Sequence, residues 1–266
     1  MRSTFALIHA SWRAAASYRL RLLLSLASLG ATVVPLYFIA NALQPVMAES
    51  IEAQGGQYFG FLIVGMVTFL LLPTAINSLP AEIGSGISTG VLEMLLATPA
   101  RATSIFSGMI GFSLLWTTAR AAALLLAGWL LGAELIWSQI ATAALILGLI
   151  VLAYLPVGMI AAALVICFRT TGPLPQGVLA VSTLLGGVYY PTTVIPSWIQ
   201  SISDWVPLTY GLRALRGTLL EGYAFPAVLP DLGALVAFII VLTGAGVLAL
   251  DGAIRYSRRA GTLAHY

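Results

Sequence analysis

Hydrophobic residues form six long runs along the chain, and nearly all charged residues lie in the gaps between these runs. The runs are centred near Val33, Val67, Leu124, Ile150, Leu184 and Ile239. Each run has about the ~20 residues that a helix needs to cross ~30 Å of hydrocarbon. Because no water reaches a bilayer core, such segments form helices that satisfy their own backbone hydrogen bonds. The pattern predicts an all-α integral membrane protein with six transmembrane helices.

The chain is expected to form a single transmembrane domain, residues 1–266. Its predicted parts are an interfacial helix (1–21), span 1 (22–42), span 2 (58–79), a cytoplasmic region (82–101), span 3 (104–132), span 4 (139–167), span 5 (173–190), outer re-entrant helices (191–222), span 6 (228–250) and a cytoplasmic tail (251–266). No gap between spans is long enough to fold as a separate catalytic or nucleotide-binding domain. We therefore expect the energy source of this protein to lie in another chain.

Amino-acid composition also supports a membrane protein and narrows the functions it can have. Hydrophobic residues make up 60% of the chain and charged residues only 8%, a balance that would leave a soluble domain insoluble. The net charge of +3 comes from twelve arginines in short clusters beside the spans, which indicates lipid headgroups or a cytoplasmic partner and no nucleic acid. The single cysteine, Cys167, excludes an internal disulfide and a multi-cysteine metal cluster.

Arginine positions predict the orientation, because loops that keep positive charge stay in the cytoplasm. Arginines precede span 1, lie between spans 2 and 3 and between spans 4 and 5, and follow span 6, which predicts cytoplasmic termini in the inner, cytoplasmic membrane. Arg213 and Arg216 lie on the opposite side in this arrangement. We expect Asp204 and Glu221 to neutralise them there; if their segment is cytoplasmic instead, the number of spans changes by one. Near the C-terminus, Asp251 is expected to pair with Arg255 at i,i+4.

The N-terminal segment combines apolar and basic residues on different helical faces. Phe5, Ile8 and Trp12 share one face, whereas Arg2 and Arg13 fall on another. This pattern is typical of an amphipathic helix that lies in the membrane interface.

Two polar islands interrupt the hydrophobic pattern. In the first, residues 80–104, Gly84, Gly86 and Gly90 permit a turn before a short helix that Thr98-Pro99 ends. On physical grounds this element is either a helix that docks into a groove of another protein or an ordinary interfacial loop.

The second island, residues 189–226, contains prolines 191, 196 and 207 and aromatic residues suited to the headgroup level, which predicts broken helices dipping into the outer leaflet.

Both islands resemble the permeases of type-2 ABC exporters. The first island has Thr89-Gly90-Val91-Leu92-Glu93, then Leu95-Leu96-Ala97-Thr98-Pro99 and Arg101; the second has Pro196-x-Trp198, Pro207-Leu208-Thr209-Tyr210, Leu215-Arg216 and Gly222. The two segments stand in the order that this family has, and the resemblance extends over essentially the whole chain. Val91 departs from the threonine that the family often has.

The resemblance implies a permease subunit of an ATP-driven exporter of amphiphiles such as drugs, antibiotics or lipid-linked saccharides. It implies a second permease copy, a homodimer in the usual case, and two copies of a cytoplasmic ATPase that binds ATP and Mg²⁺, with no catalytic residue, metal or cofactor in this chain. It implies that the short helix is a coupling helix in contact with the ATPase, through Gly90, Leu92, Glu93, Leu95, Leu96, Thr98, Pro99 and Arg101. It implies an outer gate at Pro196, Trp198, Pro207, Thr209, Tyr210 and Arg216.

Arg120 lies in the middle of the third apolar run, where an arginine costs about 2.5–3.5 kcal/mol on insertion scales. One interpretation is that it snorkels or bonds within its own helix bundle. The other is that it faces a substrate cavity and attracts an anionic headgroup.

Two other functional classes stay open. An ion-coupled secondary transporter would place an ionisable acid or an unwound polar segment at the midplane. A membrane-embedded lipid-modifying enzyme would need paired carboxylates, a metal cluster or an activated nucleophile. The sequence offers neither pattern clearly.

Overall fold

The computed structural model describes residues 19–89 and 102–260, and within these ranges the regular structure is helical throughout. The long helices are α2 (Arg19–Met47), α3 (Tyr58–Ser88), α5 (Ala102–Leu130), α6 (Ile140–Phe168) and α10 (Phe225–Ala260). The shorter elements are η1 (Glu49–Gln54), η2 (Trp137–Gln139), α7 (Leu174–Leu185), η3 (Thr192–Val194), α8 (Ser197–Ser203) and α9 (Pro207–Leu220). The predicted all-α class is confirmed.

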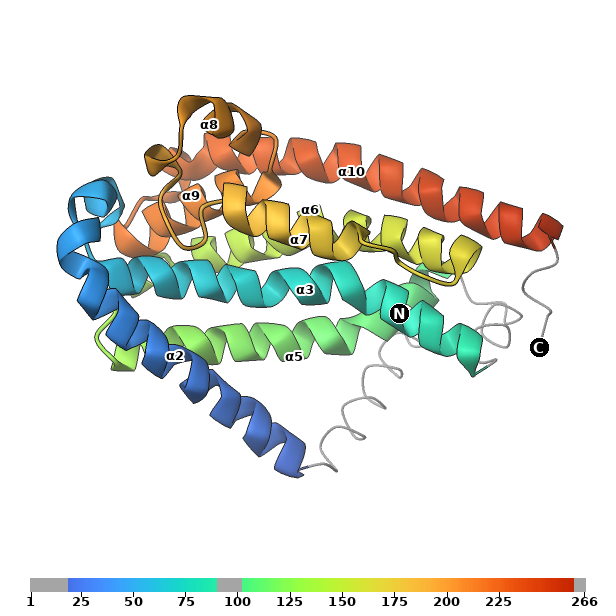
Figure 1. The fold of residues 1–266 in the computed structure, drawn as a ribbon, viewed down its shortest axis with the longest axis horizontal. Helices are drawn as coiled ribbons and strands as arrows, with labels where there is room; N and C mark the ends of the chain where they lie inside the picture. Colours follow the sequence, from blue (N-terminus) through green and yellow to red (C-terminus); the bar gives the residue numbers. More distant parts are fainter. Residues whose placement is uncertain (1–18, 90–101, 261–266) are drawn as a thin grey trace.

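The long helices lie side by side as an elongated bundle (Figure 1). One end of the bundle carries η1, η2, α8 and α9, and we refer to it as the α9 end. The opposite end carries Ser88 and Ala260, the last described residues of α3 and α10. The long helices therefore connect two chemically different ends of one molecule.

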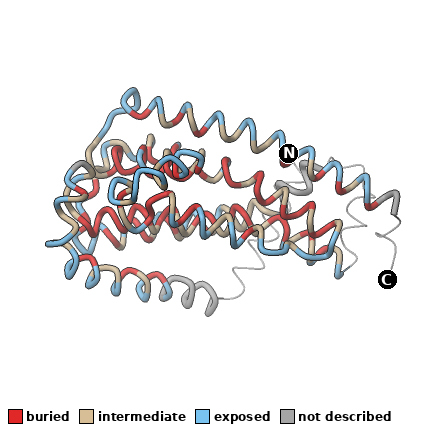
Figure 2. The backbone as a smooth tube through the Cα atoms, turned by 45° about the horizontal axis from the view of Figure 1, so that its top comes forward, coloured by how far each residue is buried: buried red, intermediate tan, exposed pale blue. Residues whose placement is uncertain are grey.

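Helices α3 and α6 form the centre of the bundle. Both are mostly buried, whereas only a small share of the apolar stretches of α2, α5 and α10 is buried (Figure 2). A Cβ added at Gly158 of α6 would lie 2.9 Å from the carbonyl oxygens of Ala75 and Ile76 on α3. A small residue here lets the two backbones approach closely, which is how helices associate in lipid.

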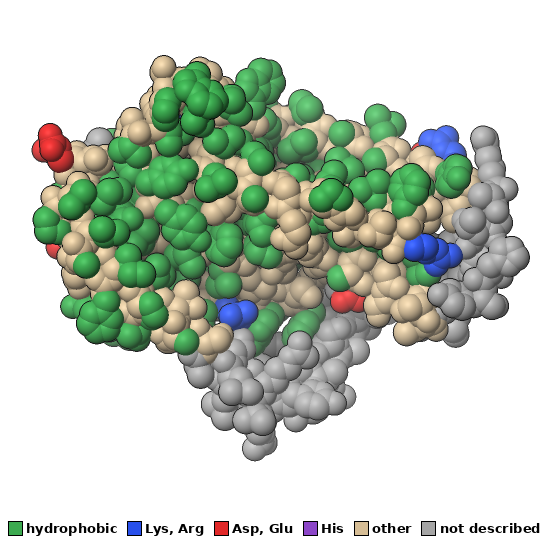
Figure 3. Space-filling view, in the orientation of Figure 1, with side chains coloured by type: hydrophobic (Ala, Val, Ile, Leu, Met, Phe, Trp, Pro, Cys, Tyr) green, Lys and Arg blue, Asp and Glu red, His purple; other side chains and the backbone are tan. Residues whose placement is uncertain are grey.

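The exposed face is apolar along most of its length. Phe38, Leu130, Ile240 and Leu248 are among the large hydrophobic side chains that it presents, and most of the few charged groups on the face in Figure 3 lie near its ends. Water does not stabilise a surface of this kind, but hydrocarbon does. The protein is a multi-pass membrane protein.

Five helices of the described ranges are long and apolar enough to cross a membrane: Ser28–Met47, Tyr58–Ser88, Ile110–Leu130, Trp137–Phe168 and Phe225–Ser257. The sequence predicts six. The difference lies at residues 173–190, where α7 has only 12 residues and is about 18 Å long at 1.5 Å per residue. The chain leaves the helix after Leu185, so this segment is too short to count as a complete spanning helix.

The first polar island also differs from its prediction. The turn expected at Gly84 and Gly86 does not form, because α3 continues through both glycines to Ser88. Local propensity does not favour a helix here, because the residues beside these glycines are isoleucine and serine, and the burial of Ile83 and Gly86 stabilises its continuation instead. Residues 90–101, the core of the predicted coupling helix, and residues 1–18 of the predicted interfacial helix lie outside the described residues.

Candidate functional site

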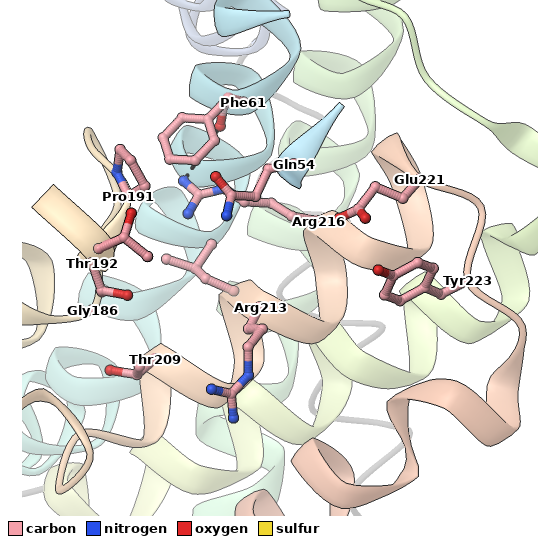
Figure 4. Close-up of a pocket in the computed structure, with 12 residues that line it drawn as sticks. Gln54, Phe61, Gly186, Pro191, Thr192, Thr209, Arg213, Arg216, Glu221 and Tyr223 are labelled. Atoms are coloured by element: carbon pink, nitrogen blue, oxygen red, sulfur yellow. Dashed lines mark hydrogen bonds between the residues drawn. The ribbon is translucent and has the colours of Figure 1, made fainter. Parts of the chain in front are cut away.

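A cavity of about 320 Å³ opens at the α9 end of the bundle (Figure 4). Its walls come from η1, the start of α3, the segment after α7, helix α9 and the loop before α10. The lining residues are Gln54, Phe61, Gly186, Pro191, Thr192, Thr193, Thr209, Leu212, Arg213, Arg216, Glu221 and Tyr223. Segments far apart in the sequence thus meet around one space, whose wall combines apolar surface with several polar side chains.

The break between α7 and α9 gives the cavity its shape. Helix α7 ends before Gly186, and Gly187 adopts a positive φ of 75°, a conformation that glycine takes without strain. Pro196 is extended and precedes α8, while Pro207 occupies the first turn of α9, where its missing N–H costs nothing. The prolines of the second polar island therefore mark helix boundaries, as the pattern predicts.

Arg216 is the organising residue of the cavity wall. Its side chain is only 5% exposed, and its Nη1 and Nη2 atoms donate hydrogen bonds to the carbonyl oxygens of Gly187 at 2.8 Å and Val188 at 3.0 Å. Nη2 also reaches the Phe61 carbonyl oxygen at 3.4 Å, and the guanidinium carbon lies 3.4 Å from the centre of the Phe61 ring. A buried cation is thus held by carbonyl dipoles and one aromatic face.

The junction around Arg216 requires a glycine on α3. A Cβ built at Gly65 would overlap the Val188 carbonyl oxygen and lie 3.1 Å from Arg216 Nη2. The Tyr58 hydroxyl fastens the same segment by donating to the Tyr189 carbonyl oxygen at 2.9 Å. Helix α3, the segment after α7 and helix α9 are therefore joined at one point.

Arg213 and Arg216 lie in different environments although they are three residues apart. Burial lowers the pKa of Arg216 to about 9, which still leaves it charged at neutral pH. Arg213 is mostly exposed and pairs with Asp231 of α10, its Nε donating to Oδ1 at 2.9 Å, and this hydrogen bond raises the pKa of Arg213. Its guanidinium also lies 5.1 Å from the centre of the Tyr210 ring.

The expected pairing of both arginines with Asp204 and Glu221 is wrong. Arg216 turns inward to backbone carbonyls, and Arg213 reaches an acid that the sequence pattern did not single out, Asp231. Hydrogen bonding to Glu221 instead raises the pKa of Tyr223, so that carboxylate lies beside the phenol at the cavity rim. By contrast, the predicted pair of Asp251 with Arg255 is present.

The predicted outer-gate residues lie at the α9 end of the bundle, and their role in a gate stays a prediction. Thr209 lines the cavity, and its hydroxyl donates to the Ser203 carbonyl oxygen at 2.7 Å. Tyr210 packs on Phe238, with ring centres 6.0 Å apart, and donates to the Asp204 carbonyl oxygen. Trp198 is exposed on α8, as an interfacial anchor would be.

Arg120 lies where α5 meets α2. Its Nη2 donates to the Ser28 hydroxyl at 3.3 Å, and its Nε is buried without a hydrogen-bond partner. This geometry favours the interpretation that Arg120 bonds within its own bundle, and a role in a substrate cavity stays a prediction. All eight predicted ATPase-contact residues lie in 90–101, outside the described residues.

Sequence reasoning missed Phe61 and Gly65, which lie against Arg216, and the cavity residue Gln54. Phe61 and Gly65 lie in an apolar run that reads as an ordinary span, and Gln54 lies in a short polar loop. An accessible signal was the pair of small residues, Gly60 and Gly65, near the start of α3, because glycine in a buried helix often marks a close approach. The described residues contain no group of three or more His, Cys, Asp or Glu side chains that could hold a metal ion.

Comparison with known families assigns the chain. A model of the ABC-2 type transporter family matches residues 3–220, which is most of the chain and includes the 90–101 segment and all of α9. This chain belongs to the ABC-2 type transporter family. No curated protein matches it by sequence. The ABC-2 membrane domain is a transport permease, generally non-catalytic, and typically works with an ATPase subunit, so the predicted resemblance is confirmed at the level of the family.

Proposed function

We propose that this ABC-2 chain is the transmembrane subunit of an ATP-driven exporter that moves an amphiphilic, lipid-like substrate outward across the cytoplasmic membrane. The observation that carries the proposal is the family match over residues 3–220 on a bundle with an apolar, lipid-compatible surface. Drugs, antibiotics and lipid-linked saccharides fit this class. The chain itself supplies the path, and a separate ATPase supplies the energy.

Chain connectivity supports six crossings with both termini in the cytoplasm. Helices α6 and α10 both run from the α9 end to the opposite end, so the chain returns between residues 168 and 225 (Figure 1). Helix α7 begins that return, and residues 186–206 complete it. The arginine distribution then supports an α9 end that faces the outside of the cell.

Helix α3 is suited to transmit force across the membrane. Its last described residues lead directly into 90–101, the proposed coupling helix, and its first turns hold Arg216 through Phe61 and Gly65. Closure of two ATPase subunits on ATP and Mg²⁺ would displace the coupling helix, and a rigid α3 would carry the displacement to the α9 end. The proposed outer gate, with Thr209, Tyr210 and Arg216, would then open.

A second copy of this chain completes the proposed transporter. The faces of α2, α5 and α10 that are not buried in the bundle are apolar, so both lipid and another permease can cover them. We propose a homodimer with two ATPase copies, and no cofactor bound by this chain.

The experiment is reconstitution with and without the partner ATPase. Purified chain and a cytoplasmic ABC ATPase encoded beside it are placed in inside-out vesicles, and ATP-dependent uptake of a fluorescent amphiphile is measured. Uptake that requires both proteins, and that an ATPase variant without its phosphate-loop lysine abolishes, is the expected result. Uptake by this chain alone on an ion gradient would establish a secondary transporter instead, and lipid modification by this chain alone would establish an enzyme.

A further inference from the structure

The cavity at the α9 end has the chemistry of a binding site for a hydroxyl-rich, uncharged group. Hydroxyls, an amide, a carboxylate and two guanidinium groups line it, together with the Tyr223 ring (Figure 4). We infer that this cavity binds a saccharide or polyol headgroup, within a single protomer. Only its placement outside the cell depends on the proposed function; the binding itself does not.

Two lining residues leave buried polar atoms without a partner. The Nε atom of Arg216, whose side chain is almost wholly buried, donates to nothing, and the Oε1 atom of Gln54 accepts from nothing. Each unpaired buried group is costly, and such groups in a folded protein call for an explanation. One is a donor and the other an acceptor, and a hydroxyl group can accept from the first and donate to the second. Both residues line the cavity, so both unpaired atoms belong to its wall.

The same wall disfavours an anion. The two Nη atoms of Arg216 are occupied by the Gly187 and Val188 carbonyl oxygens, so the guanidinium has no free fork for phosphate or carboxylate. Arg213 is already paired with Asp231, and Glu221 contributes a negative charge at the rim. The two lining arginines are balanced by Glu221 and by Asp231, which pairs with Arg213 from outside the cavity, and this balance suits a neutral ligand.

Size and shape agree with one ring of a headgroup. The volume of about 320 Å³ lies at the small end of ligand pockets, which hold roughly 300–1,000 Å³. Tyr223 packs against Gly217 of α9, where an added Cβ would lie 2.7 Å from its ring, so one aromatic wall is fixed in place. Thr192 and Thr193 supply hydroxyls on the segment after α7.

The test measures binding to the purified chain without ATPase. The chain is held in lipid nanodiscs free of sugar-based detergent, and saturation-transfer NMR follows methyl β-D-glucoside, with inorganic phosphate and 1-butanol as competitors. Wild type is expected to bind the glucoside saturably, and neither competitor should displace it. Gln54→Leu and, separately, Thr192→Val are expected to weaken binding about tenfold, equivalent to about 1.4 kcal/mol.

The matched control is Gln139→Leu, which removes another glutamine at the same end of the bundle but outside the cavity. It should bind the glucoside as wild type does. Unchanged binding in both Gln54→Leu and Thr192→Val, displacement by phosphate, or displacement by butanol would each overturn the inference. Because Thr192→Val is nearly isosteric, a folding defect in Gln54→Leu leaves the test intact. Loss of ATP-driven transport with glucoside binding intact would refute only the proposed function.

Discussion

Replacing Arg216 by methionine tests whether one buried cation holds the α9 end together. Methionine fills a similar volume but cannot donate, so the carbonyl oxygens of Gly187 and Val188 lose the hydrogen bonds that Arg216 gives them. A buried carbonyl left unpaired costs about 1–3 kcal/mol, so the two together cost about 2–6 kcal/mol. The substitution also removes the buried charge of Arg216, whose desolvation is unfavourable, and this offsets part of the cost. We expect the free energy of unfolding to fall by about 2–4 kcal/mol.

The assay is thermal unfolding of purified protein in nanodiscs. For chains of this size 1 kcal/mol corresponds to about 2–4 °C, so Arg216→Met should lower the apparent melting temperature by roughly 4–16 °C. Arg216→Lys keeps the charge but has one nitrogen in place of the planar fork, and it should recover less than half of the loss.

Arg213→Met is the matched control, because it makes the same substitution one helical turn away. Its partner Asp231 is only 15% exposed, but the Arg213 side chain is 59% exposed, so solvent screens the pair and it is worth about 0–1 kcal/mol. The reasoning is refuted if Arg216→Met and Arg213→Met melt at the same temperature, or if lysine at position 216 restores full stability.

Three further substitutions test other parts of the account. Gly65→Ala should lower the melting temperature and weaken ATP-driven transport, because its methyl group would overlap the Val188 carbonyl oxygen; a variant with wild-type melting would show that α3 and this segment can separate freely. Arg120→Ala should leave the ratio of anionic to neutral amphiphile transport unchanged, because the guanidinium bonds Ser28; a selective loss of anionic transport would favour the cavity interpretation. Leu92→Arg, in the proposed coupling helix, should abolish ATPase co-purification while the melting temperature of the chain stays the same, and retained binding would remove that contact from the model of coupling.

The polar junction around Arg216 explains why the site was only partly predictable. The prolines at 196 and 207 lie at helix boundaries, as proline favours because it lacks an N–H and fixes its own φ, whereas Pro73 and Pro80 lie inside α3. The sequence likewise marks Arg216 as a cation that needs compensation. The sequence does not reveal which groups provide that compensation. Every residue has a carbonyl oxygen, so composition cannot indicate that carbonyl oxygens will be the partners. Sequence proximity therefore predicts Asp204 and Glu221 as partners, whereas the fold places backbone carbonyl oxygens around Arg216.

Hydrophobicity alone determined the class of this protein. Free energies of transfer into lipid add up residue by residue along a span, so the all-α bundle, the lipid-facing surface and the position of most helices follow from local sequence. The free energy of close packing is not a sum over single residues, because it depends on which side chains meet. Whether α3 ends at Gly84 or continues to Ser88, and whether α7 spans or stops at Leu185, depend on packing against other elements. Arg216 likewise meets Phe61, which lies 155 positions away in the sequence. Only the tertiary structure brings those neighbours together, and with them the cavity.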